Sequence, residues 1–145
     1  AHVAALLEAL MVFSSDAAPP IRPGPTEPAL RKARVCYDHL AGEMGVYLHD
    51  RMVAEGWLTP DLSVTDRGWA KLAALDVSEG TLPQSRRPLC RTCLDWSERR
   101  HHIAGRLGRT MLDRFIALSW ARREPGSRII SFSRKGERAF MDWLA

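Results

Sequence analysis

Four side chains that commonly bind metals stand in two closely spaced pairs. Two residues separate Cys36 from His39, and two residues separate Cys90 from Cys93. Thiolate sulfur and imidazole nitrogen are donors that Zn²⁺ prefers, and this separation between cysteines is typical of its sites. In a helix, the side chains of the first pair would lie on one face, one turn apart. The spacing therefore predicts a site for zinc or another thiophilic metal made of Cys36, His39, Cys90 and Cys93.

The same residues allow two further interpretations. Reduced cysteine is among the residue types most often fully buried, so all three cysteines fit a core role. In that case His39 is hydrogen-bonded to a carbonyl or a carboxylate. Alternatively, Cys90 and Cys93 form a redox pair, for which the same spacing is typical. The sequence alone leaves metal binding, burial and redox chemistry open.

The chain contains a long internal repeat. Residues 39–57 match residues 102–120 without a gap, and residues 62–68 match residues 130–136 after a longer connection. Many of the positions that differ exchange one apolar residue for another, and hydrophobic cores of the same kind tolerate such exchanges. We therefore predict a duplicated module.

Equivalent positions of the repeat favour structural roles. His39 corresponds to His102, which favours a shared task such as bonding a helix end over metal binding by one of them. Trp57 and Trp120 also correspond, and we expect both to anchor a core where helix meets strand. Trp96 has no counterpart. Because it stands near His102, these two residues are the candidate wall of a small-molecule pocket, with core packing as the alternative.

Hydrophobic periodicity and the repeat predict an α+β fold that is mainly helical. Apolar residues at helical spacing mark residues 1–13 as a separate N-terminal helix. Prolines mark residues 14–28 as a linker. Two tandem winged-helix-like repeats are expected at residues 29–76 and 91–145, with a connector at residues 77–90.

The expected order in each repeat is helix, helix, β-hairpin, helix. Apolar residues at helical spacing across residues 30–40 predict the first helix of repeat 1. Asp95 with Glu98 forms a weak capping box that predicts the first helix of repeat 2. Thr65 and Ser133 are expected to cap the last helix of each repeat.

The composition is that of a globular protein. The 145 residues suffice for one ordinary core or two small ones, and 46% hydrophobic with 26% charged residues excludes bulk disorder. A net charge of +4 is lower than committed nucleic-acid binders usually carry. An odd number of cysteines and short apolar runs predict a soluble cytoplasmic protein without a membrane partner. The sequence has no catalytic triad, phosphate loop or dinucleotide fingerprint, so we expect no enzyme.

Two segments carry a resemblance to a known family: residues 34–42 (RVCYDHLAG) and residues 93–100 (CLDWSERR). They are similar to the C-terminal region of a subgroup of ArsR-type transcriptional regulators, and the resemblance extends over roughly the whole chain. Family members carry an N-terminal winged helix-turn-helix that binds DNA, so the resemblance implies transcriptional regulation. It also implies that residues 1–13 resemble the last helix of that DNA-binding domain, which helps to hold the dimer together.

From this resemblance we expect the chain to be part of a longer regulator. It would form the effector-sensing and dimerising part, with DNA bound by a domain that precedes it. The expected partners are DNA through that domain, a second copy of the protein, and a small effector or a metal.

The second repeat is the more basic one. Its candidate contacts to DNA phosphates are Arg106, Arg109, Arg128, Arg134 and Lys135. One alternative function is therefore a tandem winged-helix module that binds DNA directly, through phosphates rather than bases. Another is a metal-binding or interaction domain with no connection to DNA. The simplest interpretation of these side chains is a solvated surface that keeps the protein soluble.

Overall fold

The structure, a computed structural model, describes residues 2–15 and 22–145. These residues form an α+β fold of helices and small two-stranded antiparallel sheets. The elements are α1 (His2–Ser15), α2 (Pro28–Lys32), β1 (Arg34–Cys36), β2 (His39–Ala41), α3 (Glu43–Ala54), α4 (Asp66–Ala73), the 3₁₀ turn η1 (Glu79–Thr81), β3 (Arg91–Asp95), β4 (Arg100–Ala104), α5 (Gly105–Ala117), β5 (Ala121–Arg123), β6 (Ile130–Phe132) and α6 (Arg134–Leu144). None of the helices in these ranges has the length and apolar character needed to cross a membrane.

A β-hairpin precedes the long helix in each half of the chain. β1 pairs with β2 directly before α3, and β3 pairs with β4 directly before α5. A second hairpin follows each helix: a single bridge joins Leu58 to Val64 in the first half, and β5 pairs with β6 in the second. The observed order in each half is therefore hairpin, helix, hairpin, helix, with α4 and α6 as the last helices.

The first helix predicted in repeat 1 is wrong. α2 ends at Lys32, and the hairpin β1–β2 occupies the rest of residues 30–40. Tyr37 reverses the chain with a φ of 58°, which no helix contains. Helical spacing is a weak signal over ten residues, because a fully buried strand such as β2 also carries consecutive apolar residues.

The first helix predicted in repeat 2 is wrong for a different reason. Asp95 ends β3, and its side chain accepts hydrogen bonds from the backbone N–H groups of Ser97 and Glu98 at 3.0 and 3.3 Å. The same local bonds form at a helix N-cap and in a turn closed by an aspartate. The residues that resemble a capping box therefore form the turn of the hairpin β3–β4.

The helix starts predicted at Thr65 and Ser133 are confirmed. The hydroxyl oxygen of Thr65 accepts a hydrogen bond from the N–H of Gly68 at 3.0 Å. That of Ser133 accepts one from Gly136 at 2.9 Å. α4 and α6 therefore begin with the same cap, in which the third residue after the cap donates.

One hydrophobic core contains residues from both halves. Trp57 is fully buried, as predicted, and its ring lies 5.2 Å from that of Trp143 in α6. Phe115 of α5 packs against both Phe140 and Trp143 of α6. Trp120 is half-buried and stacks on Phe115 with 5.8 Å between ring centroids. Trp57 of the first half thus shares a single aromatic cluster with α5 and α6 of the second half.

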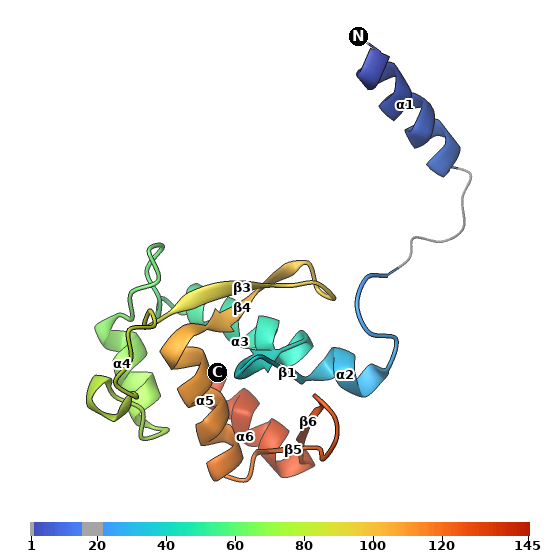
Figure 1. Cartoon of the computed structure of the whole chain (residues 1–145). Coiled ribbons are helices and arrows are strands. Elements are labelled where there is room, and N and C mark those ends of the chain that lie inside the picture. Colours follow the sequence, from blue (N-terminus) through green and yellow to red (C-terminus); the bar gives the residue numbers. More distant parts are fainter. Residues whose placement is uncertain (1, 16–21) are drawn as a thin grey trace.

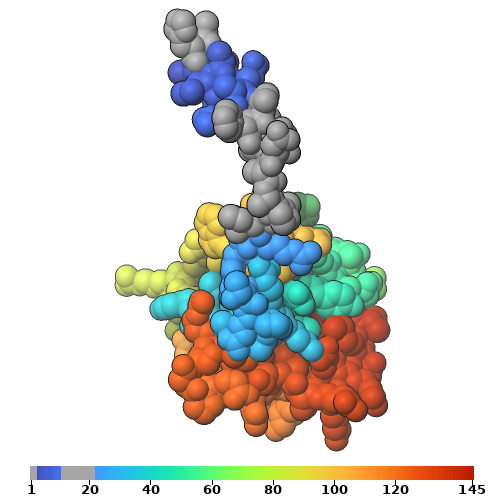
Figure 2. All heavy atoms as spheres, turned by 90° about the vertical axis from the view of Figure 1, so that its right-hand side faces the viewer, coloured from blue at the N-terminus to red at the C-terminus, as the bar shows by residue number. Residues whose placement is uncertain are grey.

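The two halves cross over one another. β4 contacts α3 of the first half, and β2 contacts α5 of the second half; Figure 1 shows the hairpin β3–β4 running beside α3. Ala33 and Val35 also make backbone hydrogen bonds to the start of the β6 hairpin arm, to Ile130 and Arg128. Figure 2 shows this light-blue segment lying against the orange hairpin. Each first hairpin is therefore held against the helix of the other half.

The N-terminal helix predicted at residues 1–13 corresponds to α1. Its side chains at Val3, Leu6, Leu7 and Leu10 are exposed. The middle of the linker predicted at residues 14–28 lies outside the described residues, and α2 begins at its end.

Candidate metal centre

Each of the two first hairpins presents one thiol and one imidazole. In β1–β2, Cys36 stands directly opposite His39, and in β3–β4, Cys93 stands directly opposite His102. Directly opposite residues of an antiparallel pair point to the same face, so each cysteine lies beside its histidine. The spacing between cysteine and histidine differs, because the turn of β3–β4 is longer than that of β1–β2.

The four side chains meet where the two hairpins approach one another. Their ligand atoms all lie within 4.8 Å of each other. The two sulfurs are 4.0 Å apart and the two Nε2 atoms are 3.0 Å apart. A tetrahedral zinc site with ordinary bond lengths has edges of about 3.8 Å between sulfurs and about 3.3 Å between nitrogens. Shifts of a few tenths of an ångström would therefore let Cys36, His39, Cys93 and His102 enclose one ion.

This set differs from the predicted one by one residue. The structure brings Cys36, His39 and Cys93 together, but Cys90 is buried in the hydrophobic core and stands outside the group. In extended chain, residues an odd number apart point to opposite faces, so Cys90 and Cys93 diverge. His102 stands in the fourth position. The repeat itself carried the signal for it, since His102 is the equivalent of His39.

A carboxylate stands behind each imidazole. The Nδ1 atom of His39 lies 3.2 Å from Asp38, whose carboxylate is also bonded to Arg87. The Nδ1 atom of His102 lies 3.1 Å from Asp95, without meeting the geometry of a hydrogen bond. Carboxylates that face Nδ1 leave Nε2 to bind a metal and fix the orientation of the ring. Both Nε2 atoms point to the centre of the cluster.

Asp95 is a fully buried anion with several donors. Arg34 donates to it at 2.8 Å and the backbone N–H of Gly42 at 2.7 Å, and Ser97 donates through both its N–H and its hydroxyl. Burial by itself raises the pKa of Asp95, but the hydrogen bonds from Ser97, Gly42 and Arg34 outweigh it and hold this pKa well below its usual range. The carboxylate is therefore charged whenever the fold is intact at neutral pH.

Burial favours the uncharged forms of three of the potential ligands, His39, His102 and Cys36, when no metal is bound. Burial and the neighbouring His39 lower the pKa of His102 to about 4, and burial also lowers the pKa of His39. Burial and the nearby Cys93 raise the pKa of Cys36 to about 11. Neutral imidazole is the form that binds metals, whereas the thiols must lose protons to a metal that enters.

Cavities flank the cluster on two sides. One of about 410 Å³ is bordered by Cys36, His102 and the largely exposed Trp96. Another of about 320 Å³ is bordered by His39 and Cys93. Trp96 and His102, the candidate ligand-binding residues, therefore line the same cavity. Both cysteines of the cluster are half-buried, and each lines one of these cavities.

The predicted phosphate contacts differ in whether their side chains already have partners. Arg106 donates to the backbone carbonyls of Arg87 and Pro83, and Arg109 lies 3.8 Å from Asp113. The other three are exposed, and in the described part of the chain no ion pair is found for them: Arg128, Arg134 and Lys135. Arg128 borders the same cavity as Trp96 and His102.

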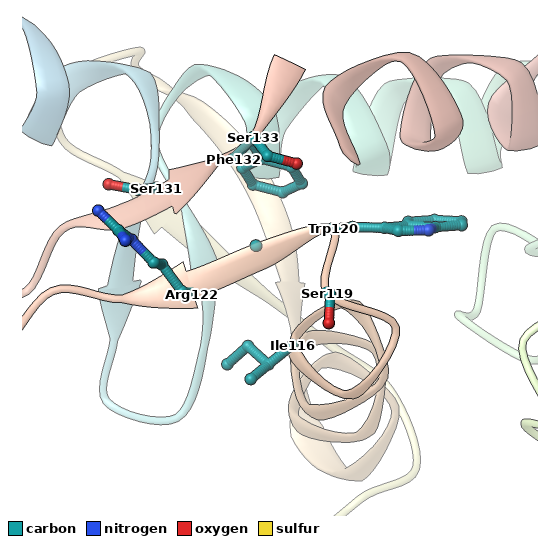
Figure 3. A pocket seen from close by; sticks show the side chains of 8 residues that line it. Ile116, Ser119, Trp120, Arg122, Ser131, Phe132 and Ser133 are labelled. Carbon is teal, nitrogen blue, oxygen red and sulfur yellow. The ribbon is translucent and has the colours of Figure 1, made fainter. Parts of the chain in front are cut away.

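A cavity of about 530 Å³ lies away from the cluster, between the end of α5 and the hairpin β5–β6. Figure 3 shows Arg122 and Ser131 at one end of it and Trp120 at the other. The guanidinium of Arg122 is paired with Glu124 at 3.0 Å, so its charge is already balanced. None of the four clustered Cys and His residues lines this cavity.

No protein-family model matches the chain, and no solved structure matches it. It is 41% identical over 114 residues to a protein of Bacillus subtilis (strain 168) named "Uncharacterized HTH-type transcriptional regulator YdfF". The match covers 77% of this chain and 50% of the relative, so the chain spans about half the length of the curated relative that it matches. The chain is thus a homologue, over that half, of a protein named as a helix-turn-helix transcriptional regulator.

Proposed function

We propose that this chain is the metal-binding, regulatory part of a transcription regulator of the ArsR type. The observation that carries the proposal is the convergence of Cys36, His39, Cys93 and His102, whose ligand atoms lie within 4.8 Å of one another. The similarity to a helix-turn-helix regulator supports a role in transcription rather than catalysis. In the whole protein, DNA would be bound by a helix-turn-helix, and the metal would be the effector.

Charge balance favours a divalent ion. Two thiolates neutralise a dication, while the flanking acids Asp38 and Asp95 are already neutralised by Arg87 and Arg34. A monovalent ion such as Cu⁺ would leave one uncompensated negative charge in a largely buried site, which is costly. Two sulfur and two nitrogen donors in a tetrahedral arrangement are typical of Zn²⁺. We therefore infer Zn²⁺ or a similar divalent ion as the ligand.

The position of the centre suggests how the ion would act on the rest of the chain. It would join β1–β2 to β3–β4, and each hairpin packs against the helix of the other half. A Cβ atom added at Gly45 would lie 3.5 Å from the Cβ of His102, and one at Gly108 would lie 3.3 Å from the Cβ of His39. A shift of His102 on metal binding would therefore displace α3, and a shift of His39 would displace α5.

Elemental analysis of the chain, purified anaerobically without chelator, tests the proposal. We expect about one zinc per chain, and Co²⁺ substitution should give the visible absorption of a tetrahedral ion with thiolate ligands. Cys93→Ser should lose the metal and the spectrum. Cys90→Ser is the matched control and should keep both, since Cys90 stands outside the cluster. Retention of full zinc by Cys93→Ser would contradict the proposed ligand set.

A second candidate function is direct DNA binding by the second half. In this proposal the chain is a tandem winged-helix-like module, and its second repeat contacts the DNA. The exposed Arg128, Arg134 and Lys135 favour it, because they lie at a hairpin and at the start of α6. Binding of the purified chain to duplex DNA that weakens steeply as salt rises would support this function. Absence of any electrophoretic shift of the DNA at low salt would leave these side chains as a solvated surface.

The proposed homodimer through α1 is tested separately. Sedimentation analysis of the chain with and without residues 2–15 would show whether this helix is needed for dimerisation.

A further inference from the structure

Two cysteines from different hairpins face each other across the cluster. The sulfurs of Cys36 and Cys93 are 4.0 Å apart, although the residues are 57 positions apart in sequence. Both side chains are half-buried, and each borders one of the flanking cavities. Cys90, by contrast, is only 8% exposed and packs in the core. The structure thus selects one pair out of three cysteines, and this is not the Cys90–Cys93 pair that the sequence spacing suggested.

We propose that Cys36 and Cys93 are an oxidation site, at which hydrogen peroxide converts the metal-free protein to an intramolecular disulfide. The two sulfurs would then hold either a metal ion or each other. The competition with metal rests on the function proposed above, whereas the disulfide itself rests only on the geometry of the two thiols. Oxidation would therefore control metal binding, because the disulfide removes two of the four ligands.

The chemistry needs one equivalent of peroxide and proceeds in two balanced steps. One cysteine loses its proton and attacks a peroxide oxygen as the thiolate; the O–O bond breaks, and the departing hydroxide takes up a proton and leaves as water, so that a sulfenic acid forms. The second thiol sulfur attacks the sulfenic sulfur, the S–O bond breaks, and a second water leaves. Both sulfurs are oxidised by one electron each, and the peroxide is reduced to two waters.

The geometry allows the S–S bond to form with small movements. A disulfide requires about 2.05 Å between the sulfurs, so each must move by about 1 Å toward the other. β1 and β3 belong to different two-stranded sheets and are not paired with each other, so no ladder hydrogen bond is broken by this approach. Rotation of the two side chains, or a slight closing of the hairpins, would supply this movement.

A bound divalent ion would prevent the reaction. In a tetrahedral site both sulfurs donate a lone pair to the ion and are held about 3.8 Å apart by it. The thiolates are then neither free to attack peroxide nor free to approach one another. Metal binding and disulfide formation are mutually exclusive uses of Cys36 and Cys93.

Peptide mapping under non-reducing conditions tests the inference. The full chain, treated with chelator and then with one equivalent of hydrogen peroxide, is alkylated and digested with trypsin. Cleavage after Arg91 places Cys90 and Cys93 on separate peptides. We expect a linked pair of peptides that contain Cys36 and Cys93, lighter than their sum by two hydrogens, and an alkylated Cys90. Cys90→Ser should give the same product, and Cys36→Ser should not form an intramolecular disulfide.

Several outcomes overturn the inference. These are a disulfide between Cys90 and either partner, oxidation of the three thiols without any link, or links mainly between molecules. A parallel sample loaded with Zn²⁺ should resist the same treatment, and equal oxidation with and without bound zinc contradicts the competition. If the chain binds no zinc but still forms the Cys36–Cys93 disulfide, the proposed metal function fails and the oxidation site stands. If the chain binds zinc but never forms the disulfide, the oxidation site fails and the proposed metal function stands.

Discussion

At the scale of single residues, the cluster is organised by charged pairs behind its ligands. Asp38 lies beside Nδ1 of His39, and Asp95 lies beside Nδ1 of His102. Neither acid belongs to the predicted ligand set. Asp38 adjoins His39 in sequence, whereas Asp95 is seven positions before His102 and was expected to cap a helix. Their role follows from the direction in which each imidazole is turned.

Replacing Asp38 with Asn should weaken zinc binding by about 10- to 100-fold while leaving the fold intact, because the carboxylate orients His39 and increases its basicity. Competition titration against a chelating zinc indicator measures the change. Asp50→Asn is the matched control, since Asp50 lies at the same 3.2 Å from Nδ1 of His49 but away from the cluster. Equal effects of the two substitutions would show that Asp38 does not act through the metal.

Replacing Arg34 with Ala should lower the free energy of unfolding by about 3 kcal/mol or more, since it leaves the buried charge of Asp95 without its cationic partner. Urea denaturation of the metal-free chain measures this loss. Arg109→Ala removes an exposed, long ion pair to Asp113 and should change the stability by less than about 1 kcal/mol. If Arg34→Ala proved as mild as this control, the ion pair with Asp95 would have little structural weight.

At the scale of elements, the sequence predicted the starts of helices better than the segments before them. The caps at Thr65 and Ser133 are local, so their residue types suffice to identify them. The hairpins β1–β2 and β3–β4 were expected to be helices, because short buried strands and aspartate-closed turns imitate helical patterns. Their strand pairing is stabilised by the helices of the other half, which no local window contains.

Gly108→Ala tests how closely α5 packs on the hairpins β1–β2 and β3–β4. A Cβ there would overlap the carbonyl oxygen of Ile103 and press on the Cβ of His39. Although alanine favours a helix interior over glycine by about 1 kcal/mol, we expect a net destabilisation of about 1–3 kcal/mol. Thermal unfolding followed by circular dichroism measures it.

Gly80→Ala serves as the control for this substitution, since the nearest atom to its Cβ is 3.9 Å away. It should leave the midpoint almost unchanged. A rise in stability for Gly108→Ala, as helix propensity alone predicts, would mean that α5 is not held tightly against Ile103 and His39.

At the scale of the whole molecule, the crossed hairpins and the shared core make the two halves interdependent. Trp57 of the first half packs on Trp143 of the second, and β2 and β4 each contact the opposite helix. The duplication visible in the sequence therefore does not give two independent units. A metal bound between the hairpins would stabilise both halves at once.

Residues 22–145 should accordingly unfold in a single transition, with the same midpoint by tryptophan fluorescence and by far-ultraviolet circular dichroism. Zinc at a free concentration 100-fold above its dissociation constant should add about 2.7 kcal/mol and raise that midpoint by about 5–10 °C. Addition of excess chelator should reverse the rise. Two separate transitions, or a rise confined to one probe, would contradict the shared core.

The sequence by itself determined the internal repeat, the equivalence of His39 with His102, the helix caps and three of the four clustered side chains. These features depend on residue identity and local spacing, which are fully present in one dimension. Only the tertiary structure decided that Cys90 points into the core and that His102 joins Cys36, His39 and Cys93. The direction of a side chain depends on whether its segment is a helix or a strand, and the approach of two hairpins depends on contacts between residues far apart in sequence.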